Sequence, residues 1–254
     1  SLSEIYLLNN DRSRAVGLLR DYIDSGQGDY PQVHLKLGNI LMTEAGFDEA
    51  ETHFRAAIDL RDGTTDIDRA YYHLAYVLYK TEEYRGALKA ANAGLSEAAP
   101  ASAGDLLNIK TNILWELGRL EEAETVLKRY LEIHPDDIHR WVDLEKLLLM
   151  QKKFDSLIEE SVSFSLEFSN VRKNNALLFF LHSYFSGTAY YMTGSYTRSV
   201  EHLSSFGDEV DSIMEWSELR SVAPFAVYYY SYGLYRTGRY ADALPLISRF
   251  EELF

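Results

Sequence analysis

The apolar positions of this chain follow a helical spacing that stops at a turn and then resumes. Residues 37–60, LGNILMTEAGFDEAETHFRAAIDL, place apolar side chains three or four positions apart on both sides of Gly46. This spacing predicts one amphipathic helix before the turn and a second one after it. Gly38 and Ala50 are small residues at positions where two antiparallel helices would approach each other closely.

The same pattern recurs along the whole chain. Its clearest mark is an aromatic residue or leucine that opens the second helix, with a smaller residue three positions later. The marks are Phe47/Ala50, Tyr84/Ala87, Leu120/Ala123, Phe154/Leu157, Tyr196/Ser199 and Tyr240/Ala243. Their spacings of 37, 36, 34, 42 and 44 residues are regular in the first half and longer in the second. With a further second helix around Ala15 and Leu19, the marks predict six complete helix pairs and a partial one.

This register resembles the tetratricopeptide-repeat family, whose two-helix unit has about 34 residues. The residues that carry the resemblance in one unit are His34, Leu37, Gly38, Leu41, Phe47, Ala50, Phe54 and Ala57. The resemblance implies an all-α fold, a right-handed α-solenoid of antiparallel helix hairpins. We expect regular hairpins over residues 1–137, with the first one partial, and divergent hairpins with longer helices over residues 138–254. An extra helical segment is expected near 207–221, within one continuous solenoid.

Two local features bear on this prediction. Gly46, Gly118, Gly194 and Gly238 fall at the ends of first helices, where a left-handed residue is common. The segment SVSFSLEFS, residues 161–169, alternates polar and apolar residues as a half-buried strand would. We nevertheless predict a helix there, because the flanking repeats offer no partner strand for the backbone donors of a lone strand.

Composition narrows the classes of partner. The chain has 46% hydrophobic residues and a net charge of −14, so its overall field opposes phosphate backbones, and we expect no nucleic-acid partner. It has no cysteine, which leaves the redox compartment undetermined. The apolar segment 176–192 is interrupted by polar residues and is short for a bilayer span, so we expect no transmembrane segment. The N-terminus lacks a signal-peptide pattern and an initiator Met, as expected of a processed or excised chain; cytoplasm and periplasm are not distinguishable.

Candidate chemistry is sparse in the sequence. The acidic pairs Asp48-Glu49, Glu82-Glu83 and Glu121-Glu122 each lie in the first turn of a second helix, where carboxylates complement the helix dipole. No two of the seven histidines form the i, i+4 pair with a nearby Glu that zinc hydrolases use. There is no glycine-rich phosphate loop and no Gly-x-Ser-x-Gly elbow. We therefore expect no metal, no cofactor and no catalytic residue, and a protein that is not an enzyme.

The family resemblance implies that first helices line a concave surface. On this chain the predicted partner groove consists of Asn39, Arg69, Tyr72, Tyr76, Tyr79, Asn108, Asn112, Trp115, Lys146, Tyr184, Tyr191, Tyr228, Tyr232 and Tyr235. Tyrosine and tryptophan offer large contact area at low entropic cost, and asparagine can pair with both backbone donors and acceptors of a peptide. We predict a noncatalytic scaffold that binds a peptide or helical segment of a partner protein. The alternative for these tyrosines is packing between neighbouring hairpins.

Some members of the family hold a C-terminal carboxylate with a Lys/Asn/Asn/Lys/Arg set over three repeats. The matching positions here are Leu35, Asn39, His73, Asp105 and Ile109, of which only Asn39 fits. The resemblance therefore does not extend to a chaperone co-adaptor role.

Two other functions stay open at this point. The chain ends in ADALPLISRFEELF, whose Leu246, Ile247, Phe250, Leu253 and Phe254 could pack against a second copy, so a homo-oligomer through the C-terminal hairpin is possible. The tyrosines of the last two hairpins could instead enclose a small ligand, as in some exported bacterial repeat proteins.

Overall fold

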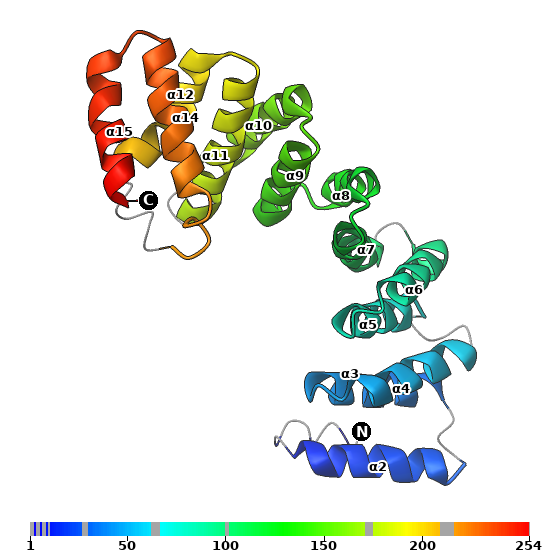
Figure 1. Cartoon of the computed structure of the whole chain (residues 1–254). Helices are drawn as coiled ribbons and strands as arrows, with labels where there is room; N and C mark the ends of the chain where they lie inside the picture. Colours follow the sequence, from blue (N-terminus) through cyan, green and yellow to red (C-terminus); the bar gives the residue numbers. More distant parts are fainter. Residues whose placement is uncertain are drawn as a thin grey trace. The chain divides into compact units, whose positions relative to one another are not determined.

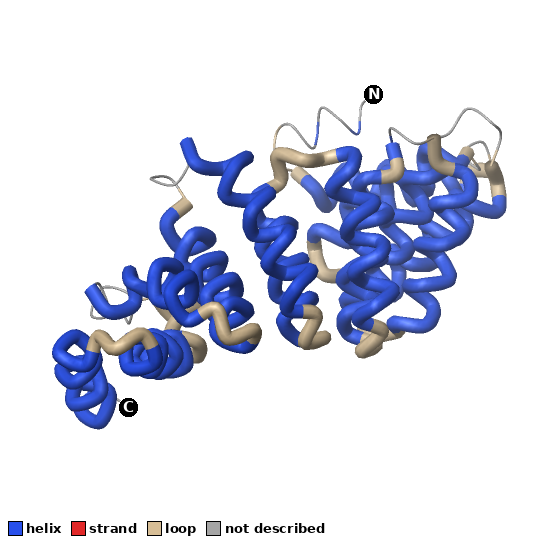
Figure 2. The backbone as a smooth tube through the Cα atoms, turned by 90° about the horizontal axis from the view of Figure 1, so that it is seen from above, coloured by secondary structure: helices blue, strands red, loops and turns tan. Residues whose placement is uncertain are grey.

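The computed structural model describes residues 11–26, 30–61, 67–99, 102–170, 175–208 and 216–253, together with Ser3, Tyr6 and Asn9. For residues 208 and 249–253 it describes the backbone alone. Within these ranges the chain forms 13 helices and no strand (Figure 2). The predicted all-α fold of tandem helix hairpins is confirmed.

The helices follow one another along the chain as antiparallel pairs after a single first helix (Figure 1). The first compact unit, Ser1–His134, contains α2 (Arg12–Asp24), α3 (Pro31–Thr43), α4 (Phe47–Asp59), α5 (Ile67–Lys80), α6 (Tyr84–Glu97), α7 (Gly104–Glu116) and α8 (Leu120–Ile133). The second unit, Pro135–Phe254, contains α9 (Ile138–Met150), α10 (Phe154–Phe168), α11 (Ala176–Met192), α12 (Tyr196–Asp208), α14 (Ala223–Arg236) and α15 (Tyr240–Leu253).

Two organisational predictions stay predictions. They are the boundary at residue 137 and the continuity of both runs in one solenoid. Of the segment near 207–221 that we expected to be helical, residues 209–215 lie outside the described residues, and 216–222 form turns before α14.

The position three residues after the start of each second helix is buried, and in most pairs it holds a small residue. Ala50, Ala87 and Ala123 are fully buried, and so are the bulky residues Phe54 and Leu127 that follow on the same helix face. Neither helix of a pair buries its apolar face alone, so each pair is stabilised by its neighbours. In the second unit the core gathers Leu203 and Phe206 of α12 with residues of α14 such as Ala226 and Leu234.

A left-handed residue stands two positions before each second helix. These residues are Ala45, Glu82, Gly118, Lys152, Gly194 and Gly238, with φ between 58° and 79°. The next residue donates its N–H to a first-helix carbonyl, as from Glu83 to Leu78 O at 2.8 Å, which closes the helix end. The prediction for Gly46 is wrong: its φ is −78°, because Ala45 already takes the left-handed position of that turn.

The segment with strand-like alternation belongs to α10, as predicted. Its buried residues are Ser161, Phe164 and Phe168, which follow the three-to-four-residue period of a helix, whereas Val162 and Leu166 are exposed. Hydrophobic residues on the solvent side therefore produce the alternating pattern. The helix prediction is confirmed here.

Candidate binding surface

Three positions of each first helix recur on the same helix face. They lie 12, 8 and 5 residues before the second helix, as Tyr72, Tyr76 and Tyr79 do before Tyr84. We call these positions the inner row. Along the six pairs the inner row reads Leu35, Asn39, Met42; Tyr72, Tyr76, Tyr79; Asn108, Asn112, Trp115; Val142, Lys146, Leu149; Tyr184, Thr188, Tyr191; and Tyr228, Tyr232, Tyr235.

In the first unit the tyrosines of the inner row are half-buried. Tyr72 and Tyr76 lie with ring centroids 6.4 Å apart, and the Lys80 ammonium is 5.4 Å from the Tyr76 centroid. All three tyrosines pack against the hydrophobic core of this unit, and burial, assisted by the Asp105 carboxylate, raises the pKa of Tyr72. These side chains therefore both complete the packing and leave part of each ring at the surface.

Arg69 and Tyr72 line a pocket of about 550 Å³ at the beginnings of α5 and α7. The rest of its lining is Asp68, His73, Ser102, Gly104, Asp105, Leu106 and His134. Arg69 is exposed, and two carboxylates, a guanidinium, a phenol and a hydroxyl share this wall. Such a surface can accept and donate hydrogen bonds to a peptide backbone and can pair with a charged side chain of either sign.

Two side chains of the same region have buried polar atoms with no hydrogen-bond partner in the fold. They are Oδ1 of Asn39 and both ring nitrogens of His73. Burial, with the nearby Arg69, lowers the pKa of His73 to about 4, and its ring stacks on Phe54 with centroids 5.3 Å apart. A buried polar group without a partner destabilises a fold by about 1–3 kcal/mol. Sequence reasoning did not include His73 in the groove, although it stands next to Tyr72.

The third pair contributes Asn108, Asn112 and Trp115, which are half-buried on α7. Each of the three already interacts with other groups of the protein. Asn39 is likewise half-buried on α3. The first unit thus brings the predicted groove residues onto consecutive first helices, α3, α5 and α7.

In the second unit the inner row ends in a ladder of tyrosines. The ring centroids of Tyr191 and Tyr229 are 4.7 Å apart, and those of Tyr232 and Tyr235 are 5.7 Å apart. The rings of Tyr228 and Tyr232 stack at an interplanar angle of 17°. Tyr228, Tyr232 and Tyr235 are 50%, 38% and 51% exposed, so no described helix covers them. With Ser231 and Ile247 they line a pocket of about 310 Å³.

Two predicted groove residues of the second unit differ from the others. Tyr184 packs against the core of α12 and α14, and burial, with the nearby Tyr229, raises its pKa to about 12. Lys146 is exposed on α9, in a hairpin whose other inner-row residues, Val142 and Leu149, are apolar. Tyr184 is therefore mainly a packing residue.

A family model for the tetratricopeptide repeat matches residues 35–103 and 72–138. They contain the pairs marked by Phe47, Tyr84 and Leu120, which are spaced 37 and 36 residues apart. Residues 35–138 consist of tetratricopeptide repeats. Such repeats generally serve protein–protein interaction without catalysis, and proteins built from them bind protein partners. No curated protein matches the chain.

Solved structures show the same fold at low sequence identity. MamA from Desulfovibrio magneticus RS-1 (residues 41 to the end) is 19% identical, with a TM-score of 0.57, over 67% of this chain and 93% of that one. YrrB, described as a TPR protein with an unusual peptide-binding site, is 15% identical, with a TM-score of 0.55, over 91% and 97%. The C-terminal part of a TPR repeat-containing protein from Cytophaga hutchinsonii is 11% identical, with a TM-score of 0.62, over 96% and 98%.

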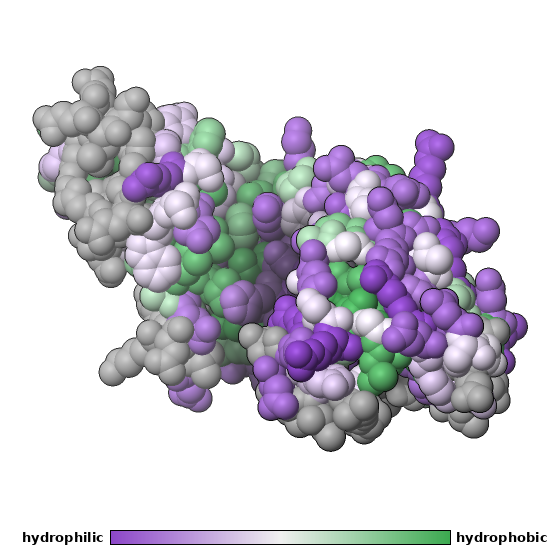
Figure 3. Space-filling model, turned by 90° about the horizontal axis from the view of Figure 1, so that it is seen from below, coloured by the Kyte–Doolittle hydropathy of each residue, from purple (hydrophilic) through white to green (hydrophobic). Residues whose placement is uncertain are grey.

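The described ranges lack two features, a membrane-spanning helix and a cluster of metal ligands. No helix in them has the length and hydrophobicity needed to cross a membrane. Nor do any three His, Asp or Glu side chains in them gather in a way that would hold a metal ion. Hydrophobic surface lies in patches among hydrophilic surface on the face shown in Figure 3.

Proposed function

We propose that the inner row of the first unit binds an extended peptide segment of a partner protein. The observation that carries this proposal is the pocket at the beginnings of α5 and α7, where Arg69 and Tyr72 converge with Ser102 and Asp105. An extended segment exposes backbone donors and acceptors, which these groups can satisfy, and the half-buried tyrosines beside them provide apolar contact area.

The unpartnered nitrogens of His73 also support peptide binding at this pocket, because a ligand could satisfy these costly buried groups. Unsatisfied buried groups are rare in native proteins and are frequently partnered by water or a ligand. His73 also lines the pocket, so a small shift of its ring on binding would give a peptide group access to it.

A peptide library tests this proposal while the partner is still unidentified. Random 12-residue peptides would be selected on the full chain, and their affinities measured by fluorescence anisotropy. We expect Arg69→Ala, and to a smaller extent Tyr72→Phe, to weaken the selected peptides, the former at least about tenfold. Arg69 is exposed, so its loss should leave the fold intact.

Arg85→Ala is the matched control, because Arg85 is an exposed arginine on α6 that does not line the pocket. Equal affinity of the selected peptides for the wild type and for Arg69→Ala would show that the pocket lined by Arg69 and Tyr72 is not their binding site.

The second unit supports a second candidate, self-association. Leu244 and Ile247 on α15 are 67% and 46% exposed beside the exposed tyrosines of α14, so this hairpin presents a sizeable apolar surface. The side chains of Phe250, Leu253 and Phe254, which were also expected to pack, lie outside the described residues. We propose that a second copy of the chain covers this surface.

Light scattering over a concentration series tests self-association. The wild type should form dimers at high concentration, and Leu244→Glu combined with Ile247→Glu should remain monomeric. Leu166→Glu on α10 is the matched control, since Leu166 is 77% exposed away from this hairpin. A wild type that is monomeric throughout the series would contradict the candidate.

A further inference from the structure

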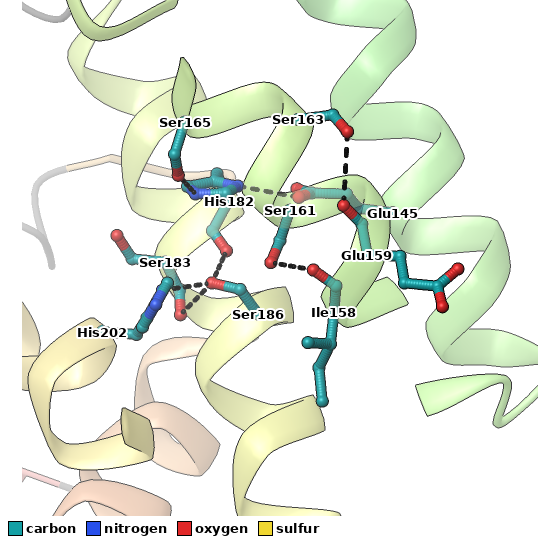
Figure 4. A network of polar contacts seen from close by, with 10 residues as sticks. All are labelled: Glu145, Ile158, Glu159, Ser161, Ser163, Ser165, His182, Ser183, Ser186 and His202. Carbon is teal, nitrogen blue, oxygen red and sulfur yellow. Dashed lines mark hydrogen bonds and ion pairs between the residues drawn. The ribbon is translucent and has the colours of Figure 1, made fainter. Parts of the chain in front are cut away.

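A polar hydrogen-bond network crosses the interior of the second unit (Figure 4). Glu145 of α9 is fully buried, and its Oε1 lies 2.7 Å from Nδ1 of His182 on α11. Nε2 of the same imidazole lies 3.2 Å from Oγ of Ser165 on α10. The His182 ring is held flat against Phe164, with centroids 4.2 Å apart. The imidazole therefore connects a buried carboxylate to a hydroxyl at the surface.

A second branch fixes the state of His202 on α12. The Ser186 hydroxyl donates its single proton to the backbone oxygen of His182 on the same helix, over 2.7 Å. Its oxygen also lies 2.8 Å from Nδ1 of His202, and in this second hydrogen bond it can only accept. His202 therefore carries its proton on Nδ1 and an acceptor lone pair on Nε2. Burial, the neighbouring His182 and Arg198 lower its pKa to about 4, so this imidazole is neutral at physiological pH.

Both branches end at a pocket of about 440 Å³ formed by α10, α11 and α12. Its lining consists of Ser165, Ser169, Phe179, His182, Ser183, Glu201, His202, Ser204 and Ser205. Among the described residues, this lining contains no Lys or Arg. Arg198, the cation one turn before His202, lies 5.5 Å from the Tyr190 ring and is not part of the wall.

The wall is rich in acceptors of hydrogen bonds. Glu201 is exposed, and no ion pair neutralises its carboxylate within the described part of the chain. Nε2 of His202 offers a lone pair, and the carbonyl end of α10, near Ser169, carries the negative end of the helix dipole. Behind His182, Oε2 of Glu145 is buried without a partner, and burial raises the pKa of this carboxyl group. Such a site repels anions and favours a donor-rich cation.

The order Ser165, His182, Glu145 is also that of a nucleophile, a base and an orienting carboxylate. Acyl transfer requires in addition hydrogen-bond donors for an oxyanion. Ser165 lies inside α10, where backbone N–H groups bond within the helix, and the nearby end of this helix presents carbonyl groups. Among the described residues the surroundings of Ser165 thus disfavour an oxyanion, so the network suits binding better than catalysis.

We propose that this pocket binds a small organic ammonium ion, with the Glu201 carboxylate and Nε2 of His202 as the acceptors of its N–H groups. The hydroxyls of Ser165, Ser204 and Ser205 complete the polar wall, and the Phe179 ring offers a face for the alkyl part or the cation. The volume lies within the range of small-molecule pockets and leaves ample room for a ligand of a few carbon atoms. This site is independent of the peptide surface of the first unit.

A matched series of four-carbon probes tests charge alone. Isothermal titration calorimetry of the full chain would compare 1,4-diaminobutane, 1,4-butanediol and succinate. We expect saturable binding of the diamine only. Glu201→Gln and His202→Phe should each weaken it about tenfold or more. Glu145→Gln changes only the group behind His182 and should weaken binding less. Because Glu201 is exposed, Glu201→Gln should fold normally.

Glu159→Gln controls for general attraction of diamines to a chain of net charge −14. Glu159 is exposed on α10, and its carboxylate points away from His202 (Figure 4). Unchanged affinity in this variant would support the pocket as the site. Equal binding of butanediol, preference for succinate, absence of diamine binding, or diamine binding insensitive to both Glu201→Gln and His202→Phe would each overturn the proposal.

Discussion

The hairpins α5–α6 and α14–α15 carry the same residues in the same register but use them differently. Both have tyrosine at all three inner-row positions and a cation one residue later, Lys80 or Arg236. In α5 the tyrosines are half-buried, because α7 packs beside that helix. In α14 they are exposed beside the apolar surface of α15. Identical side chains therefore support the core in one hairpin and mainly present surface in the other.

This comparison shows that a repeat position determines which face a residue occupies, whereas neighbouring repeats determine its energetic role. The same substitution should thus lower stability in α5 and affect only association in α14. Four sets of variants test this contrast.

The largest effect is expected from Gly94→Ala in α6. A Cβ at Gly94 would lie 2.7 Å from the Cβ of Tyr71 on α5 and 2.8 Å from Leu106 of α7, so α6 would have to move away from both helices. We expect a loss of about 3 kcal/mol of local stability, measured by hydrogen exchange of α5 to α7.

Gly86→Ala on the same helix is the control. Its Cβ would meet Leu78 at 3.5 Å, an ordinary contact, so the higher helix propensity of alanine should leave stability equal or higher. In α15, Leu244→Ala should change stability by less than about 0.5 kcal/mol, because Leu244 is 67% exposed. Equal losses for the two glycine variants would mean that α6 is not tightly packed against α5 and α7 at Gly94.

The second prediction concerns the residue after the first inner-row tyrosine, which is His73 in α5 and Tyr229 in α14. The pKa of His73 falls from 6.5 to about 4 on folding, so the unfolded chain binds more protons between these pH values. The contribution of the neutral His73 to the free energy of unfolding is complete above pH 6.5. It decreases as the pH falls toward 4, by at most about 3 kcal/mol. Tyr229, whose pKa is raised, remains neutral over this range.

Urea unfolding of the wild type and of His73→Phe at pH 7, 5.5 and 4.5 isolates the pH-dependent contribution of His73 to stability, because the two proteins share all other histidines. Phenylalanine can keep the stacking on Phe54 and removes two unpartnered nitrogens, so the variant should match or exceed the wild type at pH 7. Parallel pH profiles of the two proteins would contradict the assigned role of His73.

The third prediction compares equivalent tyrosines directly. Tyr76→Ala should lower stability by about 1–2 kcal/mol, because half of the ring packs against the core of the first unit. Tyr232→Ala should change it by about 0.5 kcal/mol or less, because Tyr232 lies on the open side of α14. Thermal unfolding followed at each hairpin by hydrogen exchange would measure both. A larger loss from Tyr232→Ala would reverse the contrast between the hairpins.

The sequence predicts the helix pairs well because local pattern and packing demand the same residues. A large residue opens each second helix, and the position three residues later is buried in every complete pair, from Ala50 to Ala243. The register also predicts the helix correctly for residues 161–169, despite their strand-like alternation, because Ser161, Phe164 and Phe168 share one buried face.

The network of the second unit could not be predicted in the same way. Glu145 and His182 are 37 residues apart on α9 and α11, so no local motif joins them. His73 stands at a position of the carboxylate clamp but does not have the residue type that the clamp requires, and its unpartnered nitrogens depend on what surrounds it in space. Whether a buried polar atom has a hydrogen-bond partner depends on packing, and the hydrophobic periodicity of the sequence does not predict it.

The smallest effects are expected in the turns, where the two hairpins differ by one residue type. Glu82 and Gly238 occupy the same left-handed position, with φ of 64° and 79°. A side chain destabilises this backbone by about 1 kcal/mol relative to glycine. Glu82→Gly should therefore stabilise α5–α6 by up to about 1 kcal/mol, and Gly238→Ala should destabilise α14–α15 by a similar amount. Opposite signs in local hydrogen exchange are the expected result. If both variants lose stability, the Glu82 carboxylate must make a favourable interaction that outweighs its backbone strain, and Glu82→Gln would then reproduce most of that loss.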